Sequence, residues 1–279
     1  MNQDITIRKF TNSDTESCAI ISNKLGWPMT VNDWNFASVL GLGTVVEKSA
    51  ELVGVGFIWP FKPDHYTLGL MIVSSDHQRQ GIGKLIMQHL LDAAGESQIR
   101  LNATIKGLPL YRKLGFNDCG FIHQHQGYPT KIQMPPNANI RTMTAIDFDN
   151  ILIIDKAASG LDRSTMLQLL AKFSSGIVIE NQQGISGFAF CRKSGLGETI
   201  GPVIATSPED AQDLMHYFIN QAEGFLRIDL EIGADSYGDF LTKAGLPMVN
   251  EIVAMKKLKM DNPTTPNSNI IALVSQALG

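Results

Sequence analysis

The sequence has few cysteines, no long hydrophobic run and no block of basic residues. Its three cysteines stand far apart and form no C-x-x-C pair, which argues against a zinc site and against a disulfide scaffold. No stretch approaches the roughly 18–20 apolar residues of a membrane span. The start, MNQDITIRKF, lacks the apolar segment of a secretion signal. We therefore expect a cytoplasmic protein with neither a membrane nor a nucleic acid as its partner.

What is present is an ordinary globular composition. Of the 279 residues, 44% are hydrophobic and 18% are charged, and the net charge is −4. At about 100–200 residues per domain, this length indicates two domains or one large one. Either half is long enough to bury a core of its own.

The chain repeats itself. The segment that begins at Ile7 recurs at Ile140, and Leu52-Val53-Gly54 recurs as Ile185-Ser186-Gly187 in the same register. Near the end of each half, Lys-Leu-Gly-Phe at 113–116 matches Lys-Ala-Gly-Leu at 243–246. A repeat this long indicates two copies of one domain. Prolines at 135 and 136 mark the boundary, so the predicted domains are 1–134 and 137–260.

Strands and helices alternate along the first copy. We predict strands over 5–9, 44–47, 52–59, 66–73, 100–103, 121–124 and 128–133. We predict helices over 15–24, 31–40, 82–94 and 108–114. This alternation predicts an α/β (α+β) fold in each copy, with a mixed central sheet flanked by helices.

The last segment differs from both copies. Residues 261–269 have the composition of a linker, and residues 270–278 form a short apolar segment. We expect this apolar segment to form a helix that docks on its own chain or on a second subunit. Both a monomer and a homodimer therefore remain open.

The most informative stretch lies between the strand over 66–73 and the helix over 82–94. Gly81 and Gly83 remove side chains where a ligand must approach the backbone. The loop leads into a helix N-terminus, whose unpaired N–H groups and positive dipole end favour a phosphate. A pyrophosphate fits such a site. The loop is neither a Walker A motif nor a G-x-G-x-x-G motif, so physics alone does not identify the nucleotide.

Two motifs carry a resemblance to a known family. Gln78-x-x-Gly81-x-Gly83 resembles the Q/R-x-x-G-x-G/A signature of the GNAT superfamily, the Gcn5-related N-acetyltransferases. Tyr111 precedes x-x-x-G-F, as in the second signature of that superfamily. Residues 101–111, with Gly26-Trp27-Pro28 and Asp33-Trp34, are similar to a bacterial subfamily with a degenerate C-terminal acetyltransferase-like domain. The resemblance covers residues 1–133 and reaches the second half only through the repeat.

The resemblance implies an N-acyltransferase that uses acetyl-CoA as co-substrate and no metal. It implies that the pyrophosphate is held by Gln78, Arg79, Gln80, Gly81, Ile82, Gly83 and Lys84. It also implies that backbone N–H groups of Met71, Ile72 and Val73 form an oxyanion hole. Tyr111 matches the general acid of the family, and the alternative is a core tyrosine. In water, proton transfer from tyrosine to a thiolate is uphill by about 1.5 pKa units, roughly 2 kcal/mol, which favours a hydrogen-bond donor.

Other candidates are open to two interpretations. His65 has a suitable ordinary pKa for a general base, but a lone loop histidine is more often exposed to solvent. Trp27 and Trp34 lie where the family shapes its acceptor pocket, and core anchoring is the alternative. His123 and His125 share one face of a strand, but the sequence supplies no third metal ligand, so we expect a plain strand face.

The second copy lacks the chemistry of the first. At the loop position it carries Pro208 and Glu209 in place of the signature glycines, and Ser207 with Asp210 is typical of a helix cap. Leu241 aligns with Tyr111. We therefore expect no coenzyme and no catalysis in the second domain.

The leading hypothesis is transfer of an acetyl group from acetyl-CoA to a primary amine of a small molecule by direct attack. The alternatives are a protein or peptide N-acetyltransferase, and a non-catalytic acyl-CoA sensor.

Overall fold

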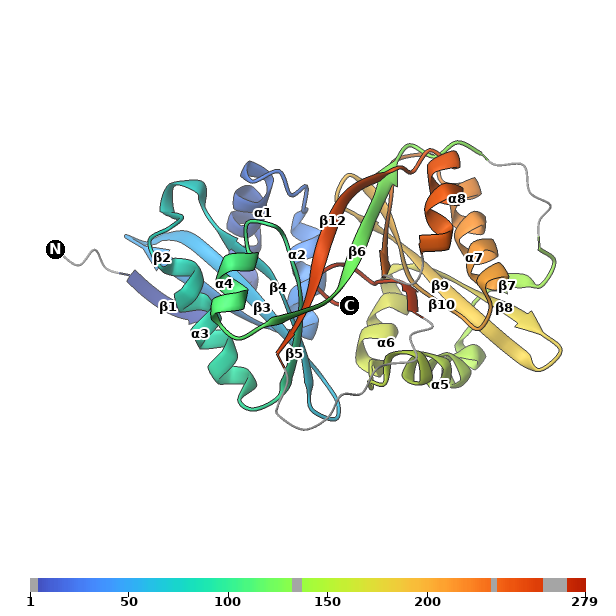
Figure 1. Cartoon of the computed structure of the whole chain (residues 1–279), viewed down its shortest axis with the longest axis horizontal. Coiled ribbons are helices and arrows are strands. Elements are labelled where there is room, and N and C mark those ends of the chain that lie inside the picture. The colour runs from blue at the N-terminus through green and yellow to red at the C-terminus, as the bar shows by residue number, and fades with distance from the viewer. Residues whose placement is uncertain (1–4, 132–136, 232–234, 258–269) are drawn as a thin grey trace. The chain divides into compact units, whose positions relative to one another are not determined.

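The computed structural model describes residues 5–131, 137–231, 235–257 and 270–279 (Figure 1). These residues form two compact units. Unit 1 contains residues 5–118, 255–257 and 278, and unit 2 contains residues 119–131, 137–231, 235–254, 270–277 and 279. No helix of this described part is long and apolar enough to cross a membrane.

Unit 1 is a mixed sheet flanked by helices. Its strands, in sheet order, are β1 (Ile5–Lys9), β2 (Leu42–Lys48), β3 (Glu51–Phe61), β4 (His65–Val73) and β5 (Gln98–Ala103), followed by the end of β12 (Met248–Lys257). Its helices are η1 (Asn12–Asp14), α1 (Thr15–Lys24), α2 (Val31–Leu40), η2 (Ser75–His77), α3 (Ile82–Ala94) and α4 (Leu108–Lys113). The first four strands are antiparallel, and β5 runs parallel to β4. Helices α1 and α2 cover one face, and α3 and α4 cover the other (Figure 1).

The two faces of β3 explain how these helices pack. On the α2 face, the rings of Phe57 and Trp59 stack 5.7 Å apart, and Trp59 Nε1 donates to the Ala37 carbonyl at 2.9 Å. On the α3 face, Gly54 and Gly56 allow Ile86 to approach the sheet, because an added Cβ would lie 2.9 and 2.8 Å from its side chain. Aromatic packing on one face and close approach on the other hold the middle of the sheet between its helices.

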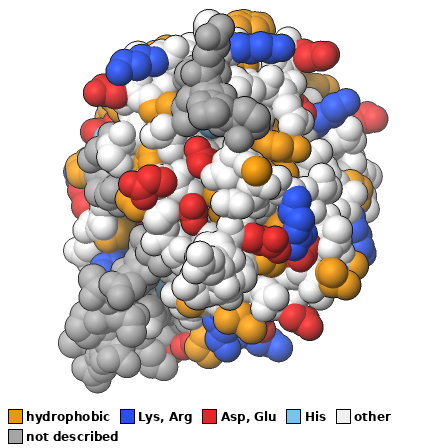
Figure 2. Space-filling view, turned by 90° about the vertical axis from the view of Figure 1, so that its right-hand side faces the viewer, with side chains coloured by type: hydrophobic (Ala, Val, Ile, Leu, Met, Phe, Trp, Pro, Cys, Tyr) orange, Lys and Arg blue, Asp and Glu red, His pale blue; other side chains and the backbone are white. Residues whose placement is uncertain are grey.

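Unit 2 has the same plan. Its strand order is β12 as far as Ala254, β6 (Asn117–Gly127), β11 (Leu226–Glu231), β13 (Ile270–Ala272), β10 (Gly197–Ala205), β9 (Gly184–Ser194), β8 (Ser175–Asn181) and β7 (Ile140–Thr142). Its helices are η3 (Ala145–Asp147), α5 (Phe148–Ser159), α6 (Ser164–Phe173), α7 (Pro208–Gln221), η4 (Asp235–Tyr237) and α8 (Gly238–Lys243). On the face shown in Figure 2, acidic, basic and hydrophobic side chains are interspersed.

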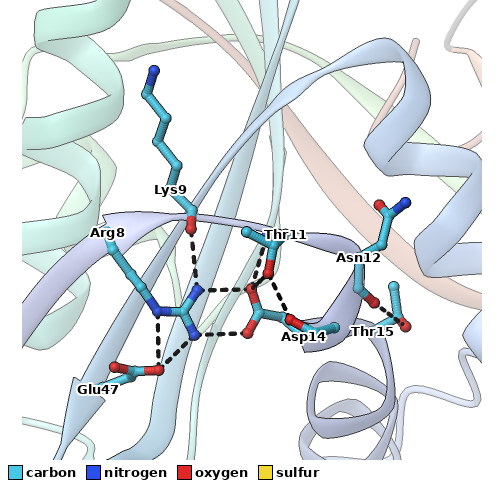
Figure 3. A network of polar contacts seen from close by, with 8 residues as sticks. Arg8, Lys9, Thr11, Asn12, Asp14, Thr15 and Glu47 are labelled. Atoms are coloured by element: carbon cyan, nitrogen blue, oxygen red, sulfur yellow. Dashed lines mark hydrogen bonds and ion pairs between the residues drawn. The ribbon is translucent and has the colours of Figure 1, made fainter.

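A duplicated ion-pair network confirms the internal repeat, and Figure 3 shows its copy in unit 1. Arg8 donates to both carboxylate oxygens of Asp14, at 2.8 and 2.7 Å, and to Glu47 on β2. Asp14 also accepts from the Thr11 N–H at 2.7 Å, so the network ties β1, β2 and the start of α1 together. The same contacts recur in unit 2 between Arg141, Asp147, Glu180 and Thr144.

The units do not follow the sequence copies. The predicted boundary at 134–137 lies largely outside the described residues. The chain passes from unit 1 to unit 2 after Asp118 and returns at Met255. Strand β6 belongs to unit 2 because it pairs antiparallel with β11 from Leu226↔Gly127 to Glu231↔Ile122. Long-range pairing of this kind leaves no trace in a repeat pattern.

Most predicted elements are confirmed, and two predictions are wrong. The helices over 15–24, 31–40 and 82–94 have the predicted bounds. Residues 121–124 and 128–133 were expected to form two strands, but β6 is one strand that ends at Gly127, and residues 128–131 lie outside it. The apolar segment over 270–278 docks on its own chain, but as strand β13 followed by turns and not as a helix. The segment forms a strand because it pairs with the edges of β10 and β11.

Candidate active site

Strands β4 and β5 pair over only the first part of their length. The register runs from His65↔Gln98 to Leu68↔Leu101, whereas β4 continues to Val73 and β5 to Ala103. On its other edge, β4 stays paired with β3 as far as Gly54↔Val73. Beyond Leu68, the backbone N–H and C=O groups on this edge of β4 therefore form no ladder hydrogen bonds with β5.

A β-bulge lies in this open part of β4. Leu70 and Met71 together oppose Gly56, because the register passes from Phe57↔Gly69 to Val55↔Ile72. Leu70 has a left-handed backbone, with φ at 52°. Met71 extends over Gly56, where an added Cβ would collide with the methionine sulfur. A bulge changes the direction of the backbone N–H and C=O groups next to it, and here these groups belong to the segment Met71–Val73.

The loop over residues 74–81 is held by its own hydrogen bonds. The Ser74 N–H donates to the Val53 carbonyl at 2.9 Å, and the Ser74 hydroxyl lies 2.9 Å from His77 Nδ1. Gln78 Nε2 donates to the Val73 carbonyl at 3.2 Å. His77 is thus part of the loop framework. The side chain of Gln78 ties the loop to the end of β4.

The loop ends at the N-terminus of α3. Gly81 is the N-cap, at a φ of 87°, and no side chain caps the helix. The first turn contains no acidic residue. An added Cβ at Gly81 meets nothing within 4 Å, so its backbone conformation, not crowding, favours glycine here. The first N–H groups and the positive end of the helix dipole suit an anion. The uncapped start of α3 is compatible with the expected phosphate loop, and phosphate binding there stays a prediction.

Helix α4 reaches this region through Leu110, the residue before Tyr111. An added Cβ at Gly83 would lie 3.5 Å from Leu110 Cδ2 and 3.8 Å from Val73 Cγ2, so the end of β4, the start of α3 and α4 meet there. Tyr111 is 8% exposed, and its ring packs edge-on against Phe116 at 6.1 Å.

Burial also changes the acidity of Tyr111. It raises the pKa of Tyr111 to about 12. Proton transfer to a thiolate whose acid has a pKa near 8.5 is then uphill by about 3.5 pKa units, roughly 5 kcal/mol. Tyr111 is suited to donate a hydrogen bond and not to surrender its proton.

The structure does not bring His65 to the bulge. His65 begins β4 and pairs with Gln98, six positions before Met71, which is about 20 Å along a strand. Its Nε2 is buried with no hydrogen-bond partner among the described residues. Burial, with a smaller effect of the Arg100 charge, lowers the pKa of His65 to about 4. A base role for His65 stays a prediction that this geometry does not support.

The two tryptophans differ in position. Trp34 is fully buried, lies 6.0 Å from the Phe57 ring and directs Nε1 toward the Ser22 hydroxyl at 3.4 Å. It is therefore a core anchor, which excludes the expected contact with an acceptor in this conformation. Trp27 is half-buried in the turn after α1, and its backbone N–H donates to the Ser22 carbonyl at 2.9 Å. Trp27 stays a candidate for the acceptor site.

His123 and His125 lie in unit 2 and have separate partners. His123 Nε2 lies 3.2 Å from Glu251, and His125 Nδ1 lies 2.9 Å from the Leu246 carbonyl. Among the residues that the structure describes, no three metal-ligating side chains come together.

Unit 2 has a different helix start at the corresponding place. Only two residues, Thr206 and Ser207, connect β10 to α7, where eight connect β4 to α3. The Ser207 hydroxyl accepts from the Asp210 N–H at 3.1 Å, which confirms the predicted cap. Glu209 and Asp210 add negative charge to the first turn. The residue matching Tyr111 is the fully buried Leu241.

Sequence reasoning missed Gly56 and the strand β13. Gly54 and Gly56 form a G-x-G pattern within a strand, which is a known signal for a bulge or a close approach, and the bulge lies opposite Gly56. The tail offered only a short apolar run, which does not distinguish strand from helix.

Comparison with known proteins agrees with this architecture. Family models described as "Acetyltransferase (GNAT) domain" match residues 41–118 and residues 151–272. The chain is 32% identical over 224 residues to the uncharacterized N-acetyltransferase YitH of Bacillus subtilis (strain 168), covering 76% of each protein. The chain belongs to the GNAT acetyltransferase family. It is an acyltransferase with two GNAT domains in tandem.

Solved structures share this fold. A protein from Pyrococcus horikoshii, described only as a candidate acetyltransferase, matches 100% of this chain and 97% of its own, with a TM-score of 0.81 and 21% identity. A tandem GNAT protein from the clavulanic acid biosynthesis pathway matches 93% of this chain and 100% of its own, with a TM-score of 0.66 and 9% identity. At these identities the likeness concerns the fold alone.

Proposed function

We propose that unit 1 transfers the acetyl group of acetyl-CoA to a primary amine of a small molecule. One observation carries this proposal. The open edge of β4 beyond Leu68 and the uncapped N-terminus of α3 are joined by the single loop over residues 74–81. The helix end suits a pyrophosphate, and the open strand edge offers backbone hydrogen bonds to an extended thioester arm.

When bound, acetyl-CoA supplies the acetyl group as a thioester. The loop backbone and the start of α3 bind its phosphates, and the β4 backbone from Met71 to Val73 donates hydrogen bonds to the carbonyl oxygen as negative charge develops there. The amine nitrogen attacks the carbonyl carbon, so that a C–N bond forms, the C–S bond breaks and the amine releases a proton to solvent. Tyr111 donates a hydrogen bond to the departing sulfur, and that thiolate takes its proton from water.

A direct test is release of free thiol from acetyl-CoA across a panel of primary amines, with unstructured peptides as a second panel. We expect turnover with small amines that is lost in Gly81→Glu. Turnover with peptides alone would favour the peptide N-acetyltransferase. Tight binding of acetyl-CoA without turnover on either panel would favour the acyl-CoA sensor and contradict the proposal.

We further propose a cytoplasmic enzyme that acts as a monomer or a homodimer. The net charge of −4 and the absence of a basic block in the sequence support an acceptor that is not a nucleic acid.

A further inference from the structure

Strands β10 and β11 separate in unit 2 as β4 and β5 do in unit 1. Both β4 and β10 have nine residues. Each leaves its parallel neighbour after its fourth residue, at Leu68↔Leu101 and at Ile200↔Ile228. Each is irregular just beyond that point, since the register of β10 with β9 shifts between Ile200 and Val203. The two units therefore contain the same opening.

In unit 2 this opening is filled by the tail of the chain. Strand β13 pairs antiparallel with β10 through Val203↔Ala272 and Ile204↔Ile270. It pairs with β11 through Leu230↔Ala272, and the Leu273 N–H donates to the Asp229 carbonyl at 2.9 Å. Val203 and Ile204 are the seventh and eighth residues of β10. The seventh and eighth residues of β4 are Met71 and Ile72, where we place the thioester arm.

The fit of this segment is close. Ala272 and Val274 are fully buried, and Ala272 is part of the hydrophobic core of unit 2. Gly201 lies so near the tail that an added Cβ would collide with the Leu273 carbonyl oxygen. Further along, Gln276 Nε2 donates to Asp229 at 3.0 Å and to Gln124 at 3.1 Å. The segment thus makes strand pairing, core packing and polar contacts together.

We propose that residues 270–274 permanently replace a cofactor in unit 2. The opening between β10 and β11 is a strand-binding site whose ligand is this segment, bound by β-augmentation within one chain. The comparison with a cofactor position rests on the proposed function of unit 1, whereas the pairing itself does not. The segment adds strand pairing and buried apolar surface to unit 2.

Two features make the segment a structural element and not a gate. The capped, acidic start of α7 and its two-residue connection offer no phosphate site, so acetyl-CoA would gain little by displacing the strand. The GNAT family model that matches unit 2 extends to residue 272 and so includes β13. A gate would require a competing ligand with a preference for the open state.

The first test is amide hydrogen exchange of the full chain with and without saturating acetyl-CoA. We expect protection near Met71–Val73 and Gly81, and no change at Val203, Ile204 or residues 270–274. Faster exchange at 270–274 on addition of acetyl-CoA would overturn the proposal, because it would show that cofactor and strand compete. If acetyl-CoA protects no part of unit 1, the proposed function fails, and the second test still decides the role of the segment.

The second test compares Gly201→Ala with Gly224→Ala. The first adds a Cβ against the Leu273 carbonyl, and the second adds one where nothing lies within 4 Å. We expect Gly201→Ala to speed exchange at residues 270–274 by about tenfold or more and Gly224→Ala to leave it within about twofold. Acetyl-CoA binding to unit 1 should be unchanged in both. Unchanged exchange at 270–274 in Gly201→Ala, or a second acetyl-CoA bound by that variant, would contradict the proposal. If Gly201→Ala does not fold, the hydrogen-exchange comparison with and without acetyl-CoA still decides whether residues 270–274 stay bound.

Discussion

Leu68 and Leu101 form the last pair of the parallel ladder between β4 and β5, and both strands continue beyond it. Ile200 and Ile228 end the corresponding ladder in unit 2, where β13 then takes the place between the strands. The two copies thus share one architectural opening. In our account, unit 1 uses it for a cofactor and unit 2 fills it with its own chain.

The N-cap of α3 provides a sharp test of the anion site. Gly81→Glu should abolish acetyl-CoA binding, because it places a negative charge at the phosphate position. Gly95→Glu is a matched control, since Gly95 caps the other end of α3, also has a positive φ, at 60°, and has open space around it. Each variant places a side chain on a backbone with positive φ. The cost is about 1–2 kcal/mol at the left-handed Gly81 and higher at Gly95, whose ψ of −129° lies outside the left-handed region, so thermal melts must first show that both variants are folded. Equal acetyl-CoA affinity in the two variants, measured by calorimetry, would rule out the proposed phosphate site.

Tyr111→Phe removes one hydrogen-bond donor to the developing thiolate, so it should lower the rate of the chemical step by about 10²-fold while leaving acetyl-CoA affinity within about twofold. Phenylalanine keeps the packing against Phe116 and removes only the hydroxyl that would support the departing sulfur. Single-turnover kinetics isolate this step. Tyr237→Phe, which changes a buried tyrosine of unit 2, should leave it unaffected. An unchanged single-turnover rate in Tyr111→Phe would reduce Tyr111 to a core residue.

His65 should remain neutral through the physiological range. Its pKa is lowered to about 4, so between that value and the ordinary 6.5 the unfolded chain binds a proton that the folded chain does not. Folding stability therefore rises with pH across this window, and His65→Gln should flatten the rise. NMR titration of the imidazole gives the midpoint directly. A midpoint near 6.5 would show that His65 is solvated and would reopen its role as a base.

The duplicated network predicts an acid-sensitive stability in each unit. Hydrogen bonds from Arg141 hold the pKa of Asp147 well below its usual range. The stability that the Asp147 carboxylate contributes to the folded state is therefore complete above its unfolded pKa near 3.9. It is lost as the pH falls through the lower pKa of the folded state. Asp147→Asn should cost about 1–3 kcal/mol at pH 7 and reduce the loss of stability in acid. Asp149→Asn, at an exposed position, is the control in denaturant titrations. Equal effects of the two changes would contradict this account.

Local signals in the sequence predicted much of the fold. Helix α2 begins at a capping box, in which the Thr30 hydroxyl accepts from the Asp33 N–H and the Asp33 carboxylate accepts from the Thr30 N–H. In helix α3, Ile82, Ile86 and Leu90 recur at helical spacing and are buried, whereas Leu85 of the same apolar pattern is exposed. Gly81 marked the turn into α3 in the same way, because its left-handed φ of 87° is a local requirement. The anion site at this turn stays a prediction.

Pairing between distant segments escaped prediction. Strand β6 belongs to unit 2 because it pairs with the edge of β11, which lies about 100 residues later in the chain. The tail became a strand because β10 and β11 left two edges open, not because of its own composition. The distance of His65 from the bulge and the burial of Trp34 likewise depend on register and packing, which motif matching does not report.

The central claim is that each chain has one active site, in unit 1. Titration calorimetry of the full chain with acetyl-CoA tests it most directly. The account predicts one acetyl-CoA per chain, with binding abolished by Gly81→Glu and retained in Gly224→Ala. Two bound molecules per chain, or one that persists in Gly81→Glu, would contradict it.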